Sequence, residues 1–374
     1  MRLRIAALLV ILLGSTGAAF ADQVVDGRIG PGALYRIVVP DTNWNGTLLL
    51  YAHGFVPASD PVALPPDAEL FVRPLVKLGF AVAYSSFSEN GWAVKDGAQR
   101  TQQLLGIFTS KFGSPSRVYI GGGSMGGLVA IKLVEEHPTW FDGMLAACPV
   151  SGGGRAQADY QANVRALFDV FYSGVLPGDA GGVPGNVDPV TEIAAPAAAA
   201  MTAEPLKALA IASVTQTPVP FANPTELGQS IVTALLGHAA AGPDLLPQLH
   251  GKPYFDNRSV LYTGTLPQLQ LDFINATVGR FDAAPSALNY LDHYYQPTGR
   301  LTIPTLTISN SRDPVAPGFH RAMYGSLVAA AGASDLLVQR TVDRYGHCDL
   351  LSAEVGAAFA DLVKWVEFGI KPAP

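Results

Sequence analysis

The chain has 374 residues and a formal net charge of −6 at pH 7; 49% of its residues are hydrophobic and 14% are charged. A chain of this length and apolar content buries a large core, which suits one large α/β domain with an insertion, or two domains. Its acidic balance and the lack of any basic cluster in the sequence argue against nucleic acid as a partner.

The first 21 residues have the pattern of a secretory signal peptide. Arg2 and Arg4 precede an apolar run at 5–13, and Ala-Phe-Ala at 19–21 is a small-residue cleavage site before Asp22. The apolar run is too short to span a bilayer, so we expect no stable membrane insertion, with an uncleaved anchor as the alternative. The mature chain is therefore predicted to begin near Asp22 and to be secreted or periplasmic.

The most informative stretch is 118–131, in which a β-branched run meets glycines and then an apolar, helix-forming segment. This pattern predicts a strand, a tight turn and a helix. Residues 122–126, Gly-Gly-Ser-Met-Gly, match G-x-S-x-G, a nucleophile elbow in which only glycines fit the positions flanking the serine. Ser124 would stand at the N-terminus of the helix, where the helix dipole and free N–H groups favour a developing negative charge.

The same glycines also fit G-x-G-x-x-G, the dinucleotide-binding pattern, at 121–126. That alternative needs an acidic residue near the end of the next strand, about 20 residues on, to bind a ribose hydroxyl. The next apolar run, 143–150, ends without an acid, and Asp142 lies at its opposite end. The nucleophile elbow is therefore the better interpretation.

These residues resemble the α/β-hydrolase superfamily of serine hydrolases, in particular its esterase-like and lipase-like members with a helical cap. The resemblance implies a mostly parallel, doubly wound sheet, which the alternation of buried strands and helices up to residue 150 also predicts. From 151 the chain becomes rich in Ala, Pro and Gly, with apolar residues at helical spacing. We expect a core at 22–151 and 300–374 and a helical cap or lid at 152–299.

The order of the remaining motifs fits the same superfamily, which places its triad in the order Ser, Asp, His. Asp313 follows a late apolar strand at 301–308, and His347 follows the last strand. We therefore predict Ser124, Asp313 and His347 as the catalytic residues. Asp343 and Asp349 are alternatives for the acid, but they lie too near His347 in sequence to come from a separate strand loop.

An H-G pair follows the buried strand at 47–52, and the superfamily places its first oxyanion donor there. By this resemblance the donors are the backbone N–H groups of Phe55 and Met125. The chain has a single glycine, Gly54, where lipases have H-G-G-G. His53 is expected to be a packed residue that orients the loop.

Trp92 lies on a loop at the expected carboxyl edge of the sheet. An aromatic side chain there would form a wall of a substrate pocket. Packing in the core is the alternative for this residue.

Cys148 and Cys348 are the only two cysteines in the sequence. An isolated pair in an oxidising compartment usually forms a disulfide, and one of the two ends the strand after the elbow helix while the other follows His347. We predict a bond between them, with two separate buried thiols as the alternative.

The function expected from these motifs is hydrolysis of carboxylic esters through a Ser-His-Asp triad and an acyl-enzyme, with a small-molecule or polymeric ester as substrate. We expect no cofactor and no metal, since the sequence has no H-E-x-x-H motif and no four-cysteine site. A serine peptidase of the prolyl-oligopeptidase or aminopeptidase type is the second hypothesis. A non-catalytic binding module is the third, although nothing structural requires all three triad residues.

Overall fold

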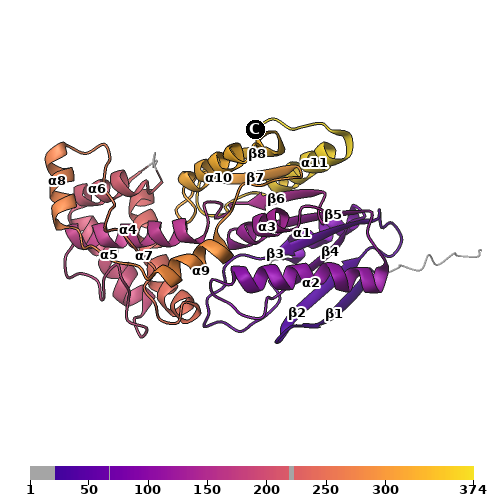
Figure 1. The fold of residues 1–374 in the computed structure, drawn as a ribbon, viewed down its shortest axis with the longest axis horizontal. Coiled ribbons are helices and arrows are strands. Elements are labelled where there is room, and N and C mark those ends of the chain that lie inside the picture. Colours follow the sequence, from indigo (N-terminus) through magenta and orange to yellow (C-terminus); the bar gives the residue numbers. More distant parts are fainter. Residues whose placement is uncertain (1–21, 67, 219–222) are drawn as a thin grey trace, which may run out of the picture.

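The computed structural model describes residues 22–66, 68–218 and 223–374. The predicted signal peptide at 1–21 lies outside the described residues. An eight-stranded sheet flanked by helices forms one part of the molecule, and a group of helices extends from one end of it (Figure 1). The expected α/β fold class is confirmed.

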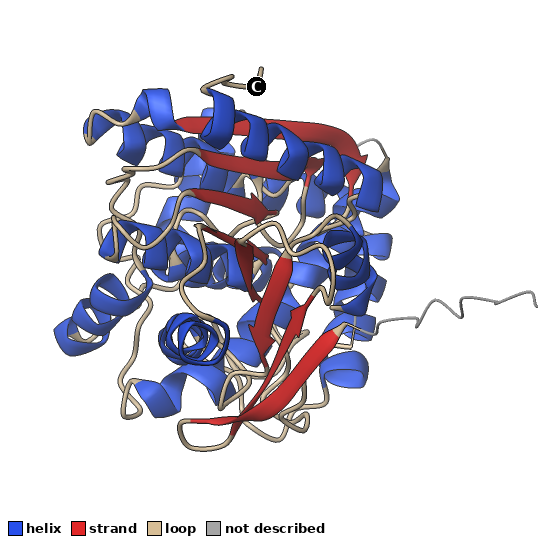
Figure 2. Ribbon diagram, turned by 90° about the vertical axis from the view of Figure 1, so that its right-hand side faces the viewer, coloured by secondary structure: helices blue, strands red, loops and turns tan. Residues whose placement is uncertain are grey.

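The sheet is mostly parallel and has the strand order β1-β2-β4-β3-β5-β6-β7-β8. Its first two strands form an antiparallel hairpin, β2 pairs antiparallel with β4, and the remaining neighbours are parallel. Figure 2 shows the strands as one twisted sheet between helices. The strands are β1 (Gln23–Ile29), β2 (Ala33–Val39), β3 (Thr47–Ala52), β4 (Ala81–Ser85), β5 (Arg117–Gly123), β6 (Gly143–Ala147), β7 (Thr305–Arg312) and β8 (Leu337–Tyr345).

Two hydrophobic cores cover the two faces of the sheet. Along β3, Leu48 and Leu50 belong to one core and Leu49 belongs to the other, because successive strand residues point to opposite faces. The helices α2 (Val94–Phe112), α3 (Met125–Glu136) and α10 (Gly318–Ala330) contribute to the first core, and α1 (Glu69–Lys77) and α11 (Ser352–Phe368) contribute to the second. The central strands are therefore buried on both sides, which explains their continuous apolar sequences.

The chain between β6 and β7 is helical, and we call its helices α4 to α9 the insertion. They are α4 (Gly154–Phe171), η1 (Pro189–Ala194), α5 (Ala195–Ala203), α6 (Pro205–Thr215), α7 (Pro224–Gln248), α8 (Gln268–Thr277) and α9 (Pro285–Tyr295); a short 3₁₀ turn, η2 (Ser334–Leu336), precedes β8. The insertion shares the larger core with the sheet, through residues such as Leu167, Ile231 and Leu291. The insertion thus packs directly against the sheet domain and shares its hydrophobic core.

The longest helix of the insertion, α7, is attached to the sheet domain near both of its ends. Near its start, Arg312 Nε donates to Glu226 Oε2 at 3.0 Å, and the Ser230 and Tyr345 hydroxyls lie 3.2 Å apart. Near its end, the Gln248 side-chain amide donates to the backbone carbonyl of Trp92 at 3.2 Å. These contacts hold α7 across the carboxyl ends of the sheet strands.

No single helix of the described chain is long and apolar enough to cross a membrane. One pair, 189–203 with Pro205–Thr215, passes such a test by length and composition only when its two parts are joined, and it is bent by 111°.

Candidate active site

Ser124 lies at the sharp turn between β5 and α3, as the motif predicts. Its φ of 55° and ψ of −122° are strained values for a residue with a side chain. A Cβ at Gly126 would overlap the carbonyl oxygen of Ala52, and one at Gly122 would overlap the backbone of Gly126. The two glycines therefore let the turn pack directly against β3, and this packing holds Ser124 in its strained conformation.

The structure brings Ser124, His347 and Asp313 together. His347 Nε2 lies 2.7 Å from Ser124 Oγ, and His347 Nδ1 lies 2.9 and 2.8 Å from the two carboxylate oxygens of Asp313. An ionised carboxylate only accepts hydrogen bonds, so Nδ1 carries the imidazole proton and Nε2 is left to accept the serine proton. The arrangement links three loops that follow β5, β7 and β8.

Asp313 is fully buried, whereas the His347 side chain is 20% exposed. The backbone N–H groups of Val315 and Ala316 each donate to Asp313 Oδ1 at 2.9 Å. These hydrogen bonds replace those that the carboxylate would make with water, and they fix the side chain in the loop after β7. The acid is thereby oriented by the backbone of its own loop.

The two alternative acids point elsewhere. Asp343 Oδ1 accepts hydrogen bonds from Arg312 and from the Ser311 hydroxyl, at 2.6 and 3.0 Å. Asp349 packs against Gly346, and its backbone carbonyl accepts a hydrogen bond from the Asn310 side chain. Of the three candidates, only Asp313 contacts His347.

The two residues predicted as oxyanion donors lie beside the serine. Met125 is the first residue of α3, so its backbone N–H has no partner within the helix. Phe55 follows Gly54, where a Cβ would stand 3.4 Å from that of Ser124. His53 is buried, stacks on Phe87 with ring centroids 3.8 Å apart, and contacts the Gly54 carbonyl through Nδ1 at 2.7 Å. His53 is thus the packed residue of the loop, while the donor roles of Phe55 and Met125 stay predictions.

Cys148 and Cys348 form the predicted disulfide, which joins the end of β6 to the loop that carries His347. The sulfur of Cys348 lies 3.7 Å from His347 Nε2. The bond closes a loop of 200 residues, which on the chain-entropy model stabilises the fold by about 5 kcal/mol. These three side chains are also the one group in the described ranges that is clustered closely enough for a metal, but the bonded sulfurs provide no thiolate.

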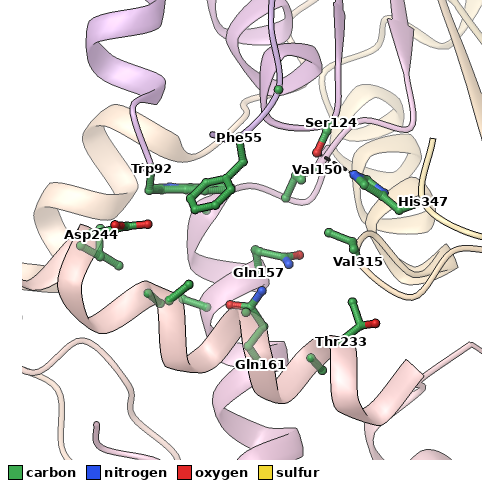
Figure 3. A pocket seen from close by; sticks show the side chains of 18 of the residues that line it. Phe55, Trp92, Ser124, Val150, Gln157, Gln161, Thr233, Asp244, Val315 and His347 are labelled. Atoms are coloured by element: carbon green, nitrogen blue, oxygen red, sulfur yellow. Dashed lines mark hydrogen bonds between the residues drawn. The ribbon is translucent and has the colours of Figure 1, made fainter. Parts of the chain in front are cut away.

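Ser124 and His347 open into a cavity of about 380 Å³ between the sheet domain and the insertion (Figure 3). Phe55 and Trp92 lie on one side of it and Val315 on the other. The Gly91 N–H donates to the Val56 carbonyl at 2.7 Å, which joins the loops of Phe55 and Trp92. Trp92 therefore lies in the cavity wall, and its role toward a substrate stays a prediction.

No protein-family model and no curated protein sequence matches this chain. Solved structures do match. The chain is similar to feruloyl esterase B from Aspergillus oryzae, at 14% identity and a TM-score of 0.52 over 93% of this chain and 81% of that one. It also matches a second Aspergillus oryzae esterase, at 16% identity and a TM-score of 0.48 over 94% and 80%, and the Pyrococcus furiosus esterase Pf2001, at 13% and 0.45 over 92% and 90%.

The sheet order, the elbow turn and the similarity to feruloyl esterase B agree. The chain has the α/β-hydrolase fold. In this fold the carboxyl ends of β3, β5, β7 and β8 meet at one edge of the sheet, which is why residues far apart in sequence converge there.

The insertion supplies cavity residues that the sequence patterns did not mark as part of a site. They come from two helices, with Gln157 and Gln161 on α4 and Thr233 and Asp244 on α7. Between the last two, α7 presents small residues at helical spacing: Ala234, Gly237, Ala240 and Ala241. The sequence does contain a pattern for these cavity residues, since polar and small residues three or four positions apart on an alanine-rich helix lie on one face of it. The sequence does not show whether that face turns toward the sheet or toward solvent.

Gln157 is held in one orientation by a buried histidine. The Gly152 N–H donates to His320 Nδ1 at 3.0 Å, so Nε2 carries the ring proton and donates to Gln157 Oε1 at 2.9 Å. Burial lowers the pKa of His320 to about 3, which keeps the ring neutral. The amide oxygen of Gln157 therefore accepts the hydrogen bond from His320, and the NH₂ group of Gln157 is available to the cavity.

Proposed function

We propose that this α/β-hydrolase is a serine hydrolase that cleaves carboxylic esters. One observation carries the proposal: the His347 imidazole is hydrogen-bonded at one nitrogen to Ser124 Oγ and at the other to the buried Asp313 carboxylate. Nothing in the packing of the sheet requires this arrangement. It is the geometry that makes a serine hydroxyl nucleophilic.

The proposed reaction begins when Ser124 Oγ attacks the ester carbonyl carbon and its proton moves to His347 Nε2. The resulting imidazolium is stabilised by Asp313, which also keeps the ring in the required orientation. His347 then gives the proton to the leaving alcohol, and an acyl-serine remains. Water, deprotonated by the same nitrogen, releases the acid and restores the serine.

The tetrahedral intermediates carry an oxyanion, for which we assign the backbone N–H groups of Met125 and Phe55. A donor of this kind contributes about 3 kcal/mol of transition-state stabilisation. Both assignments keep the oxyanion at the N-terminus of α3, where the helix dipole favours negative charge. Trp92, in the cavity wall, would then contact the bound substrate.

Esters are the proposed substrates because the cavity is lined mainly by apolar and small side chains. The solved structure with the highest TM-score reported above bears the name of a feruloyl esterase, which supports including aryl and feruloyl esters among the substrates tested. A serine peptidase is the second candidate. One observation favours it, namely a carboxylate in the cavity, Asp244, which a peptide amine could reach.

We also propose that the protein is exported. The disulfide between Cys148 and Cys348 supports this, because such bonds persist in oxidising compartments. Mass spectrometry of the mature protein from its native host would test the cleavage site, and an N-terminus at Asp22 is the expected result.

The proposed chemistry is tested with Ser124→Ala. The variant should lose p-nitrophenyl ester hydrolysis by about 10⁴-fold or more while its thermal unfolding stays cooperative. A fluorophosphonate should add one adduct to the wild-type protein, on Ser124, and none to the variant. Ser326→Ala, an exposed serine on α10, is the matched control and should keep both activity and labelling.

Residual turnover near the wild-type level in Ser124→Ala would overturn the nucleophile assignment. Parallel assays with short acyl esters, long acyl esters, aryl esters and aminoacyl anilides would separate the two candidates. Faster cleavage of the anilides than of all the esters would favour the peptidase.

A further inference from the structure

The cavity has a chemically distinct end, opposite the catalytic residues. Figure 3 shows Phe55, Trp92 and Asp244 on one side of the cavity, and His347 and Val315 on the other. Two aromatic side chains and one carboxylate therefore share a wall in which the proposed hydrolysis gives a role to the Phe55 backbone N–H and to the Trp92 side chain but none to the carboxylate. We call these three residues the distal wall.

Asp244 is placed in the distal wall by specific contacts. Its carboxyl carbon lies close to Gly91, and a Cβ added to Gly91 would be 3.0 Å from that carbon. One turn later on α7, Gln248 donates to the Trp92 carbonyl at 3.2 Å, and Trp92 packs edge-on against Tyr295 with centroids 6.3 Å apart. The carboxylate is thus held beside the loop that carries Trp92.

The Asp244 carboxylate makes no hydrogen bond and no ion pair with any residue in the described parts of the chain. Burial raises its pKa to about 6, and no positive charge there opposes this effect. A partly buried carboxylate without a partner is costly, because it loses water and gains nothing in exchange. Of the described residues that line the cavity, Asp244 is the only acid.

We propose that the distal wall binds a positively charged amino group of the substrate, with Asp244 as the ion-pair partner and Phe55 and Trp92 as apolar and aromatic surfaces around it. The inference about turnover rests on the proposed hydrolase function; the inference about binding does not. The proposed substrate class is an ester or related acyl compound that carries an ammonium at the end away from the reacting carbonyl.

An ammonium fits this wall better than a hydroxyl. A hydroxyl supplies one neutral hydrogen bond, whereas an ammonium supplies up to three donors and a full charge, and hydrogen bonds between charged groups are about twice as strong. Aromatic faces also attract cations, most strongly tryptophan. The acidic net charge of the chain adds to the same preference.

The inference is tested with three p-nitrophenyl esters of equal length: ε-aminocaproate, ε-hydroxycaproate and heptanoate. At pH 8 the wild-type kcat/KM should be higher for the amine ester than for the other two. In Asp244→Asn, which keeps the shape and removes the charge, the ratio of amine to heptanoate kcat/KM should fall by about tenfold or more. Equal wild-type rates for the amine and hydroxyl esters would overturn the assignment of a cation.

Asp159→Asn is the matched control, because burial also raises the pKa of Asp159 to about 6 but its side chain is not part of the cavity lining. This variant should keep the wild-type ratio. A ratio that falls equally in both variants, or in neither, would overturn the role of Asp244.

A binding measurement separates this inference from the hydrolase proposal. Calorimetry on Ser124→Ala should show that phenethylamine binds more tightly than 2-phenylethanol, and that adding Asp244→Asn removes the difference. If no ester is cleaved by the wild-type protein but this difference is found, the hydrolase proposal fails and the amine site stands. Equal binding of the two ligands would overturn the amine site whatever the enzyme hydrolyses.

Discussion

The sheet edge and the insertion meet at the same cavity, but they build it in different ways. At the sheet edge, backbone constraints place the reactive groups: overlapping glycine contacts fix Ser124, and two backbone N–H groups fix Asp313. In the insertion, α4 and α7 contribute side chains that line the cavity at helical spacing. The insertion therefore adds side chains to a cavity whose Ser124, Asp313 and His347 all come from the sheet domain.

This difference follows from how strands and helices present their residues. Parallel strands deliver their carboxyl ends to one edge, so loops after different strands converge with little freedom. A helix laid across that edge adds a row of side chains at 3.6-residue spacing, and its position depends on contacts at its ends. Here those contacts are Glu226 with Arg312 and Gln248 with Trp92.

The largest expected effect is a loss of activity on changing a residue at the sheet edge. In Asp313→Asn, the amide oxygen can still accept the N–H groups of Val315 and Ala316, which turns the NH₂ group toward His347. The imidazole proton then moves to Nε2. Once protonated, Nε2 can no longer accept the serine proton. We expect a fall of about 10⁴-fold in kcat with little change in KM, measured on a p-nitrophenyl ester.

Asp343→Asn is the matched control for this substitution. Asp343 lies close to His347 in sequence but bonds to Arg312, so its variant should keep wild-type kcat. A larger loss from Asp343→Asn than from Asp313→Asn would contradict the assignment of the acid.

A second prediction tests whether the elbow depends on backbone packing. Gly126→Ala would force the added Cβ into the backbone carbonyl of Ala52, and neither atom can rotate away because the Cβ is fixed by its own backbone. We expect destabilisation of about 3 kcal/mol or more, seen as a lower midpoint of denaturant unfolding. Gly106→Ala, in α2, has nothing within 4 Å of the added Cβ and should instead stabilise the protein by up to about 1 kcal/mol. Equal midpoints for the two variants would argue against backbone contact as the cause.

The smallest expected effect concerns the insertion and depends on pH. Burial raises the pKa of Asp244 from about 3.8 to about 6, so its ionisation lowers the stability of the folded protein above pH 6. As pH falls through 6 toward 4, the folded protein takes up this proton before the unfolded chain does, and the penalty is lost. Asp244→Asn should therefore raise the melting temperature at pH 8, and the gain should shrink by pH 5.

Differential scanning fluorimetry across that pH range would measure this trend. Asp41→Asn, which changes an exposed carboxyl, should show no gain that varies with pH. A stabilisation by Asp244→Asn that grows as the pH falls would contradict the buried, unpaired state of the carboxylate.

Much of the catalytic edge could be predicted from sequence, because the constraints there are local. The glycines around Ser124 exist for a turn that spans five residues, and the loop after β7 bonds to its own Asp313. The disulfide was also predictable, because the chain holds only two cysteines. Strand ends were less accurate: the late strand expected at 301–308 is β7, which begins at Thr305 and runs to Arg312.

The distal wall could not be predicted in this way. Asp244 was visible as one of several scattered acids in an alanine-rich region, and nothing near it in sequence marks it for the cavity. It faces the cavity because α7 is attached near one end to Arg312, the last residue of β7, and at the other to Trp92 in the loop after β4, which lie 86 and 156 residues away from their partners along the chain.

The sequence by itself determined the class of fold, the elbow at Ser124 and the position of His347 after the last strand, since each depends on residues close in the chain or on the order of strands in a parallel sheet. Only the tertiary structure decided which of the neighbouring acids reaches His347, and which face of α7 closes the cavity. A helix has several faces of similar composition, and the one that turns inward is chosen by contacts with distant loops.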